Sequence, residues 1–230
     1  GERDCSIQRN HQKMIEESPS AAVSPELREK MGHAAVTAAK AAGYVNAGTI
    51  EFLLEPDGKF WFMEMNTRIQ VEHPVTEWVT GIDLVKEQLK IASGMPLEIA
   101  QEDVRIQGHA IECRINAENP QKNFRPSPGT IQGAHFPGGN GIRVDTCVYN
   151  GCKIPPYYDS MLAKLIVHAG NRKEAIAKMQ SALGEVIIDG IDTNIDYQYE
   201  ILKDEDYQSG NFDTGFLASH IIAGVKINEN

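Results

Sequence analysis

The feature that most restricts the fold is a pair of apolar, β-rich runs on either side of a turn sequence. TIEFLL (49–54) is followed by PDG (56–58) and then by KFWFMEMN (59–66). Two such runs around Asp-Gly are the strongest short-range signal of a β-hairpin. We therefore predict an antiparallel hairpin, with either a two-residue loop at Asp57-Gly58 or a four-residue loop around the same dipeptide.

Both loop lengths give the same register, which places Glu51 directly opposite Glu64. Opposed residues lie on one face with Cβ atoms about 4.5–5.5 Å apart, where two like charges destabilise the pair. Because the rest of the hairpin is apolar, the two acids require a cation or a shared proton. A Mg²⁺ ion held by both carboxylates and by phosphate oxygens of a substrate would satisfy them. The alternative is a solvated face on which the two charges are tolerated.

Polar residues continue at every second position after the hairpin, and the full set is Glu64, Asn66, Arg68, Gln70 and Glu72. An extended segment would place them on one face, and Pro74 is expected to end it. A metal ion, a guanidinium and a free carboxylate suit the transfer of a phosphoryl group to a small oxyanion. The metal neutralises phosphate charge, Arg68 clamps a planar anion, and Glu72 accepts a proton. The residues alone therefore predict a metal and anion site.

Capping signals predict two helices in the same part of the chain. Ser24-Pro25-Glu26 is typical of a helix start, and apolar residues then recur at helical spacing until Gly43. The many alanines in this helix predict a buried face packed closely on a sheet. Asp83 is expected to cap a second helix that ends at Gly94. The segment 95–105 has no clear period, so we place a boundary there, with domains at 1–106 and 107–230.

The second domain is expected to contain strands followed by helices. Strands are predicted at 108–116 and in GTIQGAHF, IRVDTCVY and SMLAKLIVHA, and Asn171 is expected to cap a helix. Two shorter helices are predicted at 194–202 and 213–223. The fold class is therefore α+β. PGGNG (137–141) lacks the Lys-Ser/Thr of a phosphate loop and is expected to be a plain turn.

Composition excludes several classes of function. The formal net charge is -10, which argues against nonspecific binding of nucleic acid, since this needs a basic surface. No apolar run approaches the roughly 18–20 residues of a membrane span, and the first residues are charged, so we expect a cytoplasmic protein without a membrane segment. The four cysteines form no metal-binding motif and are expected to be buried, reduced thiols.

At the polar residues described above, the sequence resembles the biotin carboxylase family, the ATP-grasp component of biotin-dependent carboxylases. The motif EMNTRIQVEHPVTE (64–77), with GTIEFL (48–53) before it, resembles the signature of that family. Further familial motifs follow in the family's order over nearly the whole chain: ERDCSIQRNHQK, GHAIECRINAE, PSPG, YYDSMLAKL and IDGIDTN. Other ATP-grasp ligases keep the two acids and the Asn without the RIQVEHP continuation.

The resemblance implies a role for each matching residue. Glu51 and Glu64 would hold Mg²⁺ or Mn²⁺ beside the phosphates of ATP, with Asn66 as a third metal ligand. The implied bicarbonate site consists of Lys13, Arg68, Gln70, the backbone at Val71, and Glu72. Gln8, His11 and Leu53 would line the nucleotide. Glu72 would be the catalytic base, with Arg68 beside it, and Arg114 would bind biotin and stabilise its enolate oxygen.

The resemblance also implies a reaction and its partners. Bicarbonate would attack the γ-phosphate of ATP to give carboxyphosphate, whose decomposition delivers CO₂ to N1′ of biotin. The biotin would be carried by a biotin carboxyl carrier protein or domain, a carboxyltransferase would use the product, and the complete enzyme would be a homodimer. Arg143 matches a position used at the family's dimer interface, whereas Asn140 replaces an aromatic residue found in some relatives. The acyl-CoA or pyruvate carboxylase served is not indicated.

A complete member of the family is expected to be about twice this long, with an N-terminal α/β domain and a glycine-rich lid over the phosphates. The chain resembles the C-terminal half, so we expect it alone to be inactive. Two alternatives remain: a noncatalytic module for dimerisation or carrier docking, and another ATP-grasp ligase of the carbamoyl phosphate synthetase type. His73 is expected to be structural.

Overall fold

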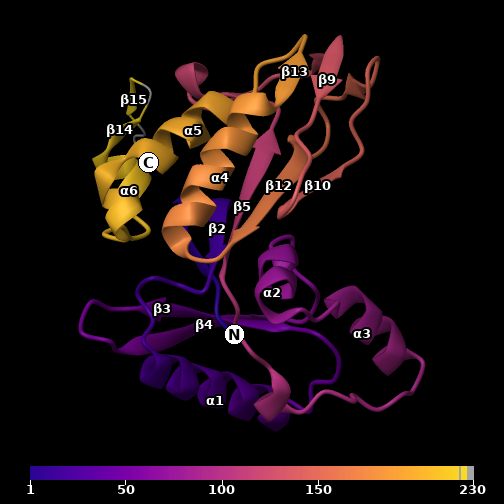
Figure 1. The fold of residues 1–230 in the computed structure, drawn as a ribbon, viewed down its shortest axis with the longest axis vertical. Helices are drawn as coiled ribbons and strands as arrows, with labels where there is room; N and C mark the ends of the chain where they lie inside the picture. The colour runs from indigo at the N-terminus through magenta and orange to yellow at the C-terminus, as the bar shows by residue number, and fades with distance from the viewer. Residues whose placement is uncertain (223, 227–230) are drawn as a thin grey trace. The chain divides into compact units, whose positions relative to one another are not determined.

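The computed structural model describes residues 1–222 and 224–226, which form two units (Figure 1). The first unit contains residues 1–3 and 18–107, and the second contains residues 4–17 together with the residues from 108 onward. The predicted domain limits of 1–106 and 107–230 differ from this division, because residues 4–17 group with the second unit. The limits 1–106 and 107–230 therefore remain a prediction of where the folding domains begin and end.

The first unit is built from short elements around one β-hairpin. In chain order they are α1 (Pro25–Ala41), β3 (Thr49–Leu54), β4 (Phe60–Asn66), α2 (His73–Thr80), α3 (Leu84–Ala92) and the 3₁₀ helix η1 (Gln101–Asp103). Both predicted caps are confirmed: the Ser24 hydroxyl accepts from the Leu27 amide at 3.2 Å, and the Asp83 carboxylate accepts from the Lys86 amide at 2.8 Å. These side chains satisfy amides that a helix start leaves unpaired.

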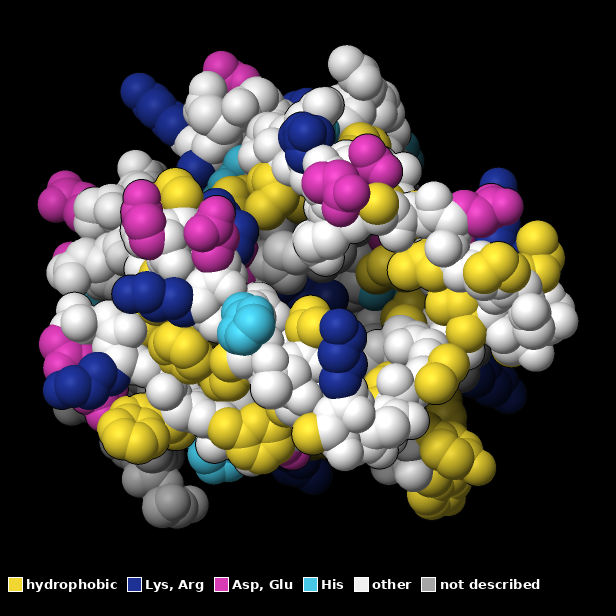
Figure 2. All heavy atoms as spheres, turned by 90° about the horizontal axis from the view of Figure 1, so that it is seen from below, with side chains coloured by type: hydrophobic (Ala, Val, Ile, Leu, Met, Phe, Trp, Pro, Cys, Tyr) yellow, Lys and Arg dark blue, Asp and Glu magenta, His cyan; other side chains and the backbone are white. Residues whose placement is uncertain are grey.

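The expected buried face of α1 is not found. None of its 17 residues is buried in the structure. Large apolar side chains elsewhere in the first unit are also exposed, including Leu53, Trp61, Phe62 and Leu89, and hydrophobic side chains are visible at the surface in Figure 2. The first unit therefore buries little of its own apolar surface. The spacing of the alanines predicted the helix correctly but not the burial of its face.

The β3–β4 hairpin has the predicted pairing of its acids but a different turn. The loop has three residues: the Gly58 amide donates to the Glu55 carbonyl at 2.9 Å, and the Glu55 amide donates to the Lys59 carbonyl at 2.8 Å. Gly58 takes the left-handed conformation (φ 84°) that such a loop requires. Leu54 consequently faces Phe60, and an irregularity between the Glu51 and Phe52 pairs restores Glu51 to a position opposite Glu64.

The prediction of an extended segment after the hairpin is wrong. Strand β4 ends at Asn66, and the chain turns before α2 begins at His73. Pro74 lies in the first turn of this helix, where its missing amide hydrogen has no intrahelical partner to lose. The alternation of polar residues therefore continues through a turn and a helix start, not along one strand.

The second unit contains a five-stranded sheet in the order β1-β2-β5-β12-β10, in which β1–β2, β5–β12 and β12–β10 are antiparallel pairs. Its strands are β1 (Asp4–Arg9), β2 (Gln12–Ser18), β5 (His109–Asn116), β12 (Met161–Ala169) and β10 (Ile142–Thr146). The last residue of β2, Ser18, belongs to the first unit. The three later strands were predicted. Strands β1 and β2 were not, because their sequence is rich in charged and polar residues.

Helices pack against this sheet, and the unit also contains small two-stranded pairs. Helix α4 (Arg172–Glu185) lies along β5 and β12 (Figure 1) and buries Ala175, Ile176, Met179, Ala182 and Leu183. It is followed by α5 (Ile195–Lys203), α6 (Glu205–Ser209) and α7 (Phe216–Ser219). The helix predicted at 213–223 is thus only four residues long, and strand β14 (Ile221–Ile222) follows it; Ala223 lies outside the described residues.

The remaining elements of the second unit are short. Four small antiparallel pairs are formed by β6 (Glu118–Asn119) with β7 (Arg125–Pro126), β8 (Gly129–Thr130) with β11 (Lys153–Ile154), β9 (Gly133–His135) with β13 (Ile187–Asp189), and β14 (Ile221–Ile222) with β15 (Val225–Lys226); η2 (Pro120–Lys122) is a 3₁₀ turn. The four cysteines are reduced thiols as expected, but only Cys113 is buried and Cys147 is exposed.

Two consecutive glutamates of β2 are buried and paired on opposite faces of the strand. Glu16 is fully buried and Glu17 is 2% exposed. The Glu17 carboxylate accepts from His109 Nε2 at 2.6 Å and from two guanidinium nitrogens of Arg172 at 2.8 and 3.1 Å. Charge-assisted and bidentate bonds of this kind offset the cost of removing the carboxylate from water. They connect β2 to β5 and α4.

Replacing Glu17 by Gln is expected to destabilise the second unit by about 3–5 kcal/mol, because it leaves the Arg172 guanidinium, whose side chain is only 16% exposed, without its counter-charge. The matched control is Glu200→Gln, which breaks a solvent-exposed pair with Lys203 and is expected to change the unfolding free energy by less than about 1 kcal/mol. Hydrogen exchange of the β5 and β12 amides, measured by mass spectrometry, reports this unit alone. Equal exchange in the two variants would contradict the prediction.

Candidate metal and anion site

The two opposed acids of the hairpin share one hydrogen-bond donor. Asn66 Nδ2 donates to Glu51 Oε1 at 3.1 Å and to Glu64 Oε1 at 2.9 Å. The carboxylates therefore lie on the same face of the hairpin and converge on one point, as the register predicted. Two ionised oxygens that converge on one electropositive group are the arrangement that a hard divalent ion accepts.

Asn66 also connects the acids to Arg68. The Arg68 guanidinium donates to Asn66 Oδ1 at 3.1 Å and to the Ile69 carbonyl at 3.1 Å. In this arrangement the amide presents its nitrogen to the acids and its oxygen to the guanidinium. To act as the third metal ligand that the sequence predicts, Asn66 would have to turn its amide so that Oδ1 faces the acids. Arg68 itself is exposed, so its guanidinium is accessible to an anion from solvent.

The turn after β4 buries two of the predicted anion-binding residues. Gln70 is 5% exposed and Glu72 is 2% exposed, with Val71 between them. The Gln70 carbonyl accepts from the His73 amide at 3.2 Å and from His73 Nδ1 at 2.8 Å. His73 therefore fixes the backbone of the turn, which agrees with the structural role expected for it. Glu72 stands at the N-cap of the eight-residue helix α2, whose positive end favours a carboxylate.

Gln70 joins this turn to the acid pair. Its Nε2 donates to Glu51 Oε1 at 2.7 Å. Its Oε1 accepts from the guanidinium of Arg3, which also donates to Thr49 Oγ1 at 2.9 Å and to Thr76 Oγ1 at 3.2 Å. Sequence reasoning assigned no role to Arg3, because a single cation near the start of the chain gives no periodic signal.

The other predicted site residues, except Leu53, lie in the second unit. Gln8 and Lys13 are cross-strand partners in the β1–β2 hairpin, and His11 lies in the turn between these strands with a positive φ of 60°. Leu53, predicted to line the nucleotide with them, is instead on β3 of the first unit and is 52% exposed. The predicted nucleotide residues are therefore divided between the two units.

Arg114 is held in the second unit by a buried carboxylate that sequence reasoning missed. On β5, its Nε donates to Glu16 Oε1 at 2.6 Å. The Arg114 side chain is 17% exposed, whereas that of Glu16 is fully buried. The pairing fixes the plane of the guanidinium while leaving part of it accessible. The Glu16–Glu17 pair could have indicated this partner only if β2 had been predicted as a strand, and only one of two adjacent acids in a strand is normally expected to be buried.

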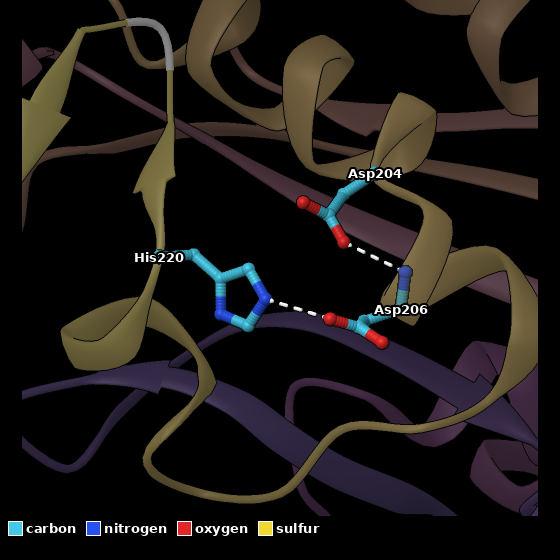
Figure 3. Close-up of side chains that lie close together, drawn as sticks. All are labelled: Asp204, Asp206 and His220. Carbon is cyan, nitrogen blue, oxygen red and sulfur yellow. Dashed lines mark hydrogen bonds and ion pairs between the residues drawn. The ribbon is translucent and has the colours of Figure 1, made fainter.

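One other group of side chains has ligand types suited to a metal ion. Figure 3 shows Asp204, Asp206 and His220 close together, all partly exposed. Each already has a partner: Asp204 caps α6, and His220 Nε2 lies 3.0 Å from Asp206 Oδ2. The hydrogen bond to Asp206 raises the pKa of His220. These contacts account for the cluster as a local link between α6 and the end of α7.

Comparisons with known proteins identify the family. The chain matches the models for the carbamoyl-phosphate synthase L chain, ATP binding domain, over residues 1–100 and for the biotin carboxylase C-terminal domain over residues 112–219. It is 59% identical over 225 residues to Biotin carboxylase 1 of Bacillus subtilis, covering 97% of this chain and 50% of that protein. The chain belongs to the biotin carboxylase family. Biotin carboxylase of Haemophilus influenzae is 55% identical over 216 residues, covering 94% of this chain and 48% of that protein.

Solved structures of the family agree with the fold. The biotin carboxylase domain of the 2-oxoglutarate carboxylase of Hydrogenobacter thermophilus matches with a TM-score of 0.93 and 52% identity, over 94% of this chain and 48% of that one. That structure is described as a dimer in complex with MgADP, ADP and bicarbonate. The chain spans about half the length of the relatives it matches. Among the described residues, no helix has both the length and the apolar character needed to cross a membrane.

Proposed function

We propose that this chain carries the metal-binding and bicarbonate-binding part of a biotin carboxylase. The observation that carries the proposal is the convergence of Glu51 and Glu64 on one point, linked through Asn66 to Arg68 and through Gln70 to the turn that ends at Glu72. The bicarbonate and MgADP named for the Hydrogenobacter relative suit the chemistry of these groups. Mg²⁺ held by the two acids, with Mn²⁺ as a substitute, would neutralise the phosphate charge of ATP.

The residues of this chain then take the following parts in the reaction. Arg68, assisted by Lys13, orients bicarbonate, and Glu72 accepts its proton as an oxygen of bicarbonate attacks the γ-phosphorus and ADP leaves. The resulting carboxyphosphate decomposes to CO₂ and phosphate, and the phosphate removes the N1′ proton of biotin. Arg114 stabilises the enolate oxygen that develops on biotin, whose nitrogen then attacks CO₂. Gln8, His11 and Leu53 line the nucleotide.

The proposal includes the partners of the complete enzyme. A biotin carboxyl carrier protein or domain presents the biotin, a carboxyltransferase consumes the carboxybiotin, and two copies of the biotin carboxylase form a homodimer. The Hydrogenobacter relative is described as a dimer, which supports the last point. We also assign Arg143 to the dimer interface. It lies on β10, where it donates to Asp145 at 2.8 Å.

A chimeric enzyme provides the test. Its N-terminal half comes from Bacillus subtilis Biotin carboxylase 1, and its C-terminal half is this chain. We expect ADP release that depends on both biotin and bicarbonate, together with transfer of ¹⁴C from bicarbonate to biotin. ATP use that depends on ammonia or glutamine would instead support a ligase of the carbamoyl phosphate type. A folded dimer that binds ADP but fixes no ¹⁴C would support the noncatalytic alternative.

A further inference from the structure

We infer that Arg3 is a positioning residue that fixes the Gln70 amide between the metal carboxylate and the anion-binding turn. The inference rests on the proposed function, because it assigns Glu51 to the metal and Gln70 to bicarbonate. The Arg3 guanidinium contacts three parts of the first unit: Thr49 on β3, Gln70 in the turn after β4, and Thr76 on α2. A planar guanidinium can hold such separate acceptors in fixed directions, whereas an ammonium is a point charge.

The contacts of Gln70 determine which way its amide faces. Arg3 has no acceptor atom, so Gln70 must present its Oε1 to the guanidinium. An ionised Glu51 has no donor, so Gln70 must present its Nε2 to that carboxylate, at 2.7 Å. Both ends therefore require the same orientation of a side chain that is only 5% exposed. Without Arg3, one of these two constraints disappears and the amide can turn over.

The orientation of Gln70 in turn affects both ligand sites. Glu51 Oε1 accepts from Gln70 and from Asn66, which fixes the direction of the carboxylate that is proposed to hold the metal. Mg²⁺ demands near-ideal geometry, and the loss of a residue that orients a metal ligand typically weakens affinity or activity by about 10–100-fold. The same amide belongs to the turn proposed to bind bicarbonate. Arg3 is therefore expected to influence the metal and the anion together.

A purely structural role for Arg3 is the competing explanation, and Arg28 provides the matched control. Arg28 makes a similar part-buried bidentate pair with Glu2 near the start of the chain, at 2.5 and 2.6 Å. These contacts do not involve Gln70, Glu51 or Glu64. If Arg3 only fastens the N-terminal segment, Arg3→Met and Arg28→Met will lower the melting temperature without changing ligand affinity. If Arg3 positions Gln70, only Arg3→Met will change affinity.

The test measures Mn²⁺ affinity by EPR in the presence of ADP, and the KM for bicarbonate, on the chimeric enzyme described above. We expect Arg3→Met to weaken Mn²⁺ binding and to raise the bicarbonate KM, each by about 10–100-fold, with Arg28→Met within about twofold of wild type. Arg3→Lys should recover only part of the loss. Arg3→Met added to Gln70→Leu should have no further effect, because the two residues act as one unit.

Unchanged Mn²⁺ affinity in Arg3→Met, or additive effects of Arg3→Met and Gln70→Leu, would overturn the inference. The Mn²⁺ measurement requires no turnover. A chimera that binds Mn²⁺ and ADP but lacks activity dependent on biotin and bicarbonate therefore contradicts the proposed function while still testing Arg3.

Discussion

Replacing Glu72 by Gln is expected to lower the kcat of the chimeric enzyme by about 10²–10⁴-fold, the usual contribution of a general base. Gln has nearly the same volume, so the buried position at the start of α2 remains filled. The amide cannot accept the bicarbonate proton at neutral pH. Because the nucleotide and metal residues are untouched, the affinity for ATP should remain close to that of wild type.

Glu55→Gln is the matched control for this experiment, since Glu55 is an exposed glutamate directly before the hairpin loop of the same unit. Its carboxylate accepts from Trp61 Nε1 at 2.7 Å, and the side-chain carbonyl of Gln can accept the same hydrogen bond. Steady-state ADP release should be unchanged in this variant. A wild-type kcat in the Glu72→Gln variant would show that Glu72 is not the general base.

Replacing Arg114 by Lys is expected to reduce carboxybiotin formation by about 10²–10³-fold, as for loss of a group that stabilises a developing oxyanion. Lys keeps the charge beside the buried carboxylate of Glu16, so the fold should survive, but it lacks the planar fork that Glu16 orients. Because Arg114 is proposed to act after carboxyphosphate has formed, ADP release should fall less than carboxylation. The ratio of carboxybiotin to ADP should therefore drop.

Arg9→Lys is the control for this second variant. The Arg9 guanidinium lies 4.5 Å from the centre of the Phe124 ring and donates to Asn123, and neither of these partners is proposed to take part in catalysis. Its ratio of carboxybiotin to ADP should equal that of wild type. An unchanged ratio and rate in Arg114→Lys would exclude Arg114 from the stabilisation of biotin.

The sequence predicted the facing acids correctly although its account of the turn was wrong. The loop has three residues instead of two or four, and an irregularity in the register compensates for this difference before Glu51 is reached. Turn signals such as Asp-Gly indicate that a hairpin exists, whereas the loop length depends on the conformation of Pro56 and Gly58. An irregularity of register leaves no signature in a run of apolar residues.

The contacts that support the site were less predictable than the site residues. Gln70 and Glu72 appeared as members of one strand face, but they lie in a turn and at a helix start, because periodicity cannot distinguish an extended segment from a short turn. The buried pair of Glu16 and Arg114 joins residues 98 positions apart in the chain. Such a pairing depends on the order of strands in the sheet, which local sequence does not specify.

Binding of a divalent ion is the sharpest test of the role proposed for Glu51 and Glu64. The EPR signal of free Mn²⁺ can be titrated with the chimeric enzyme and ADP, in wild type and in a variant carrying Glu51→Gln and Glu64→Gln. The loss of two ligands should exceed the roughly 10–100-fold effect of losing a residue that only orients a ligand. We expect Mn²⁺ affinity to fall by at least that much in the double variant while the protein remains folded. Equal affinity in the two proteins would show that the facing carboxylates do not hold the metal.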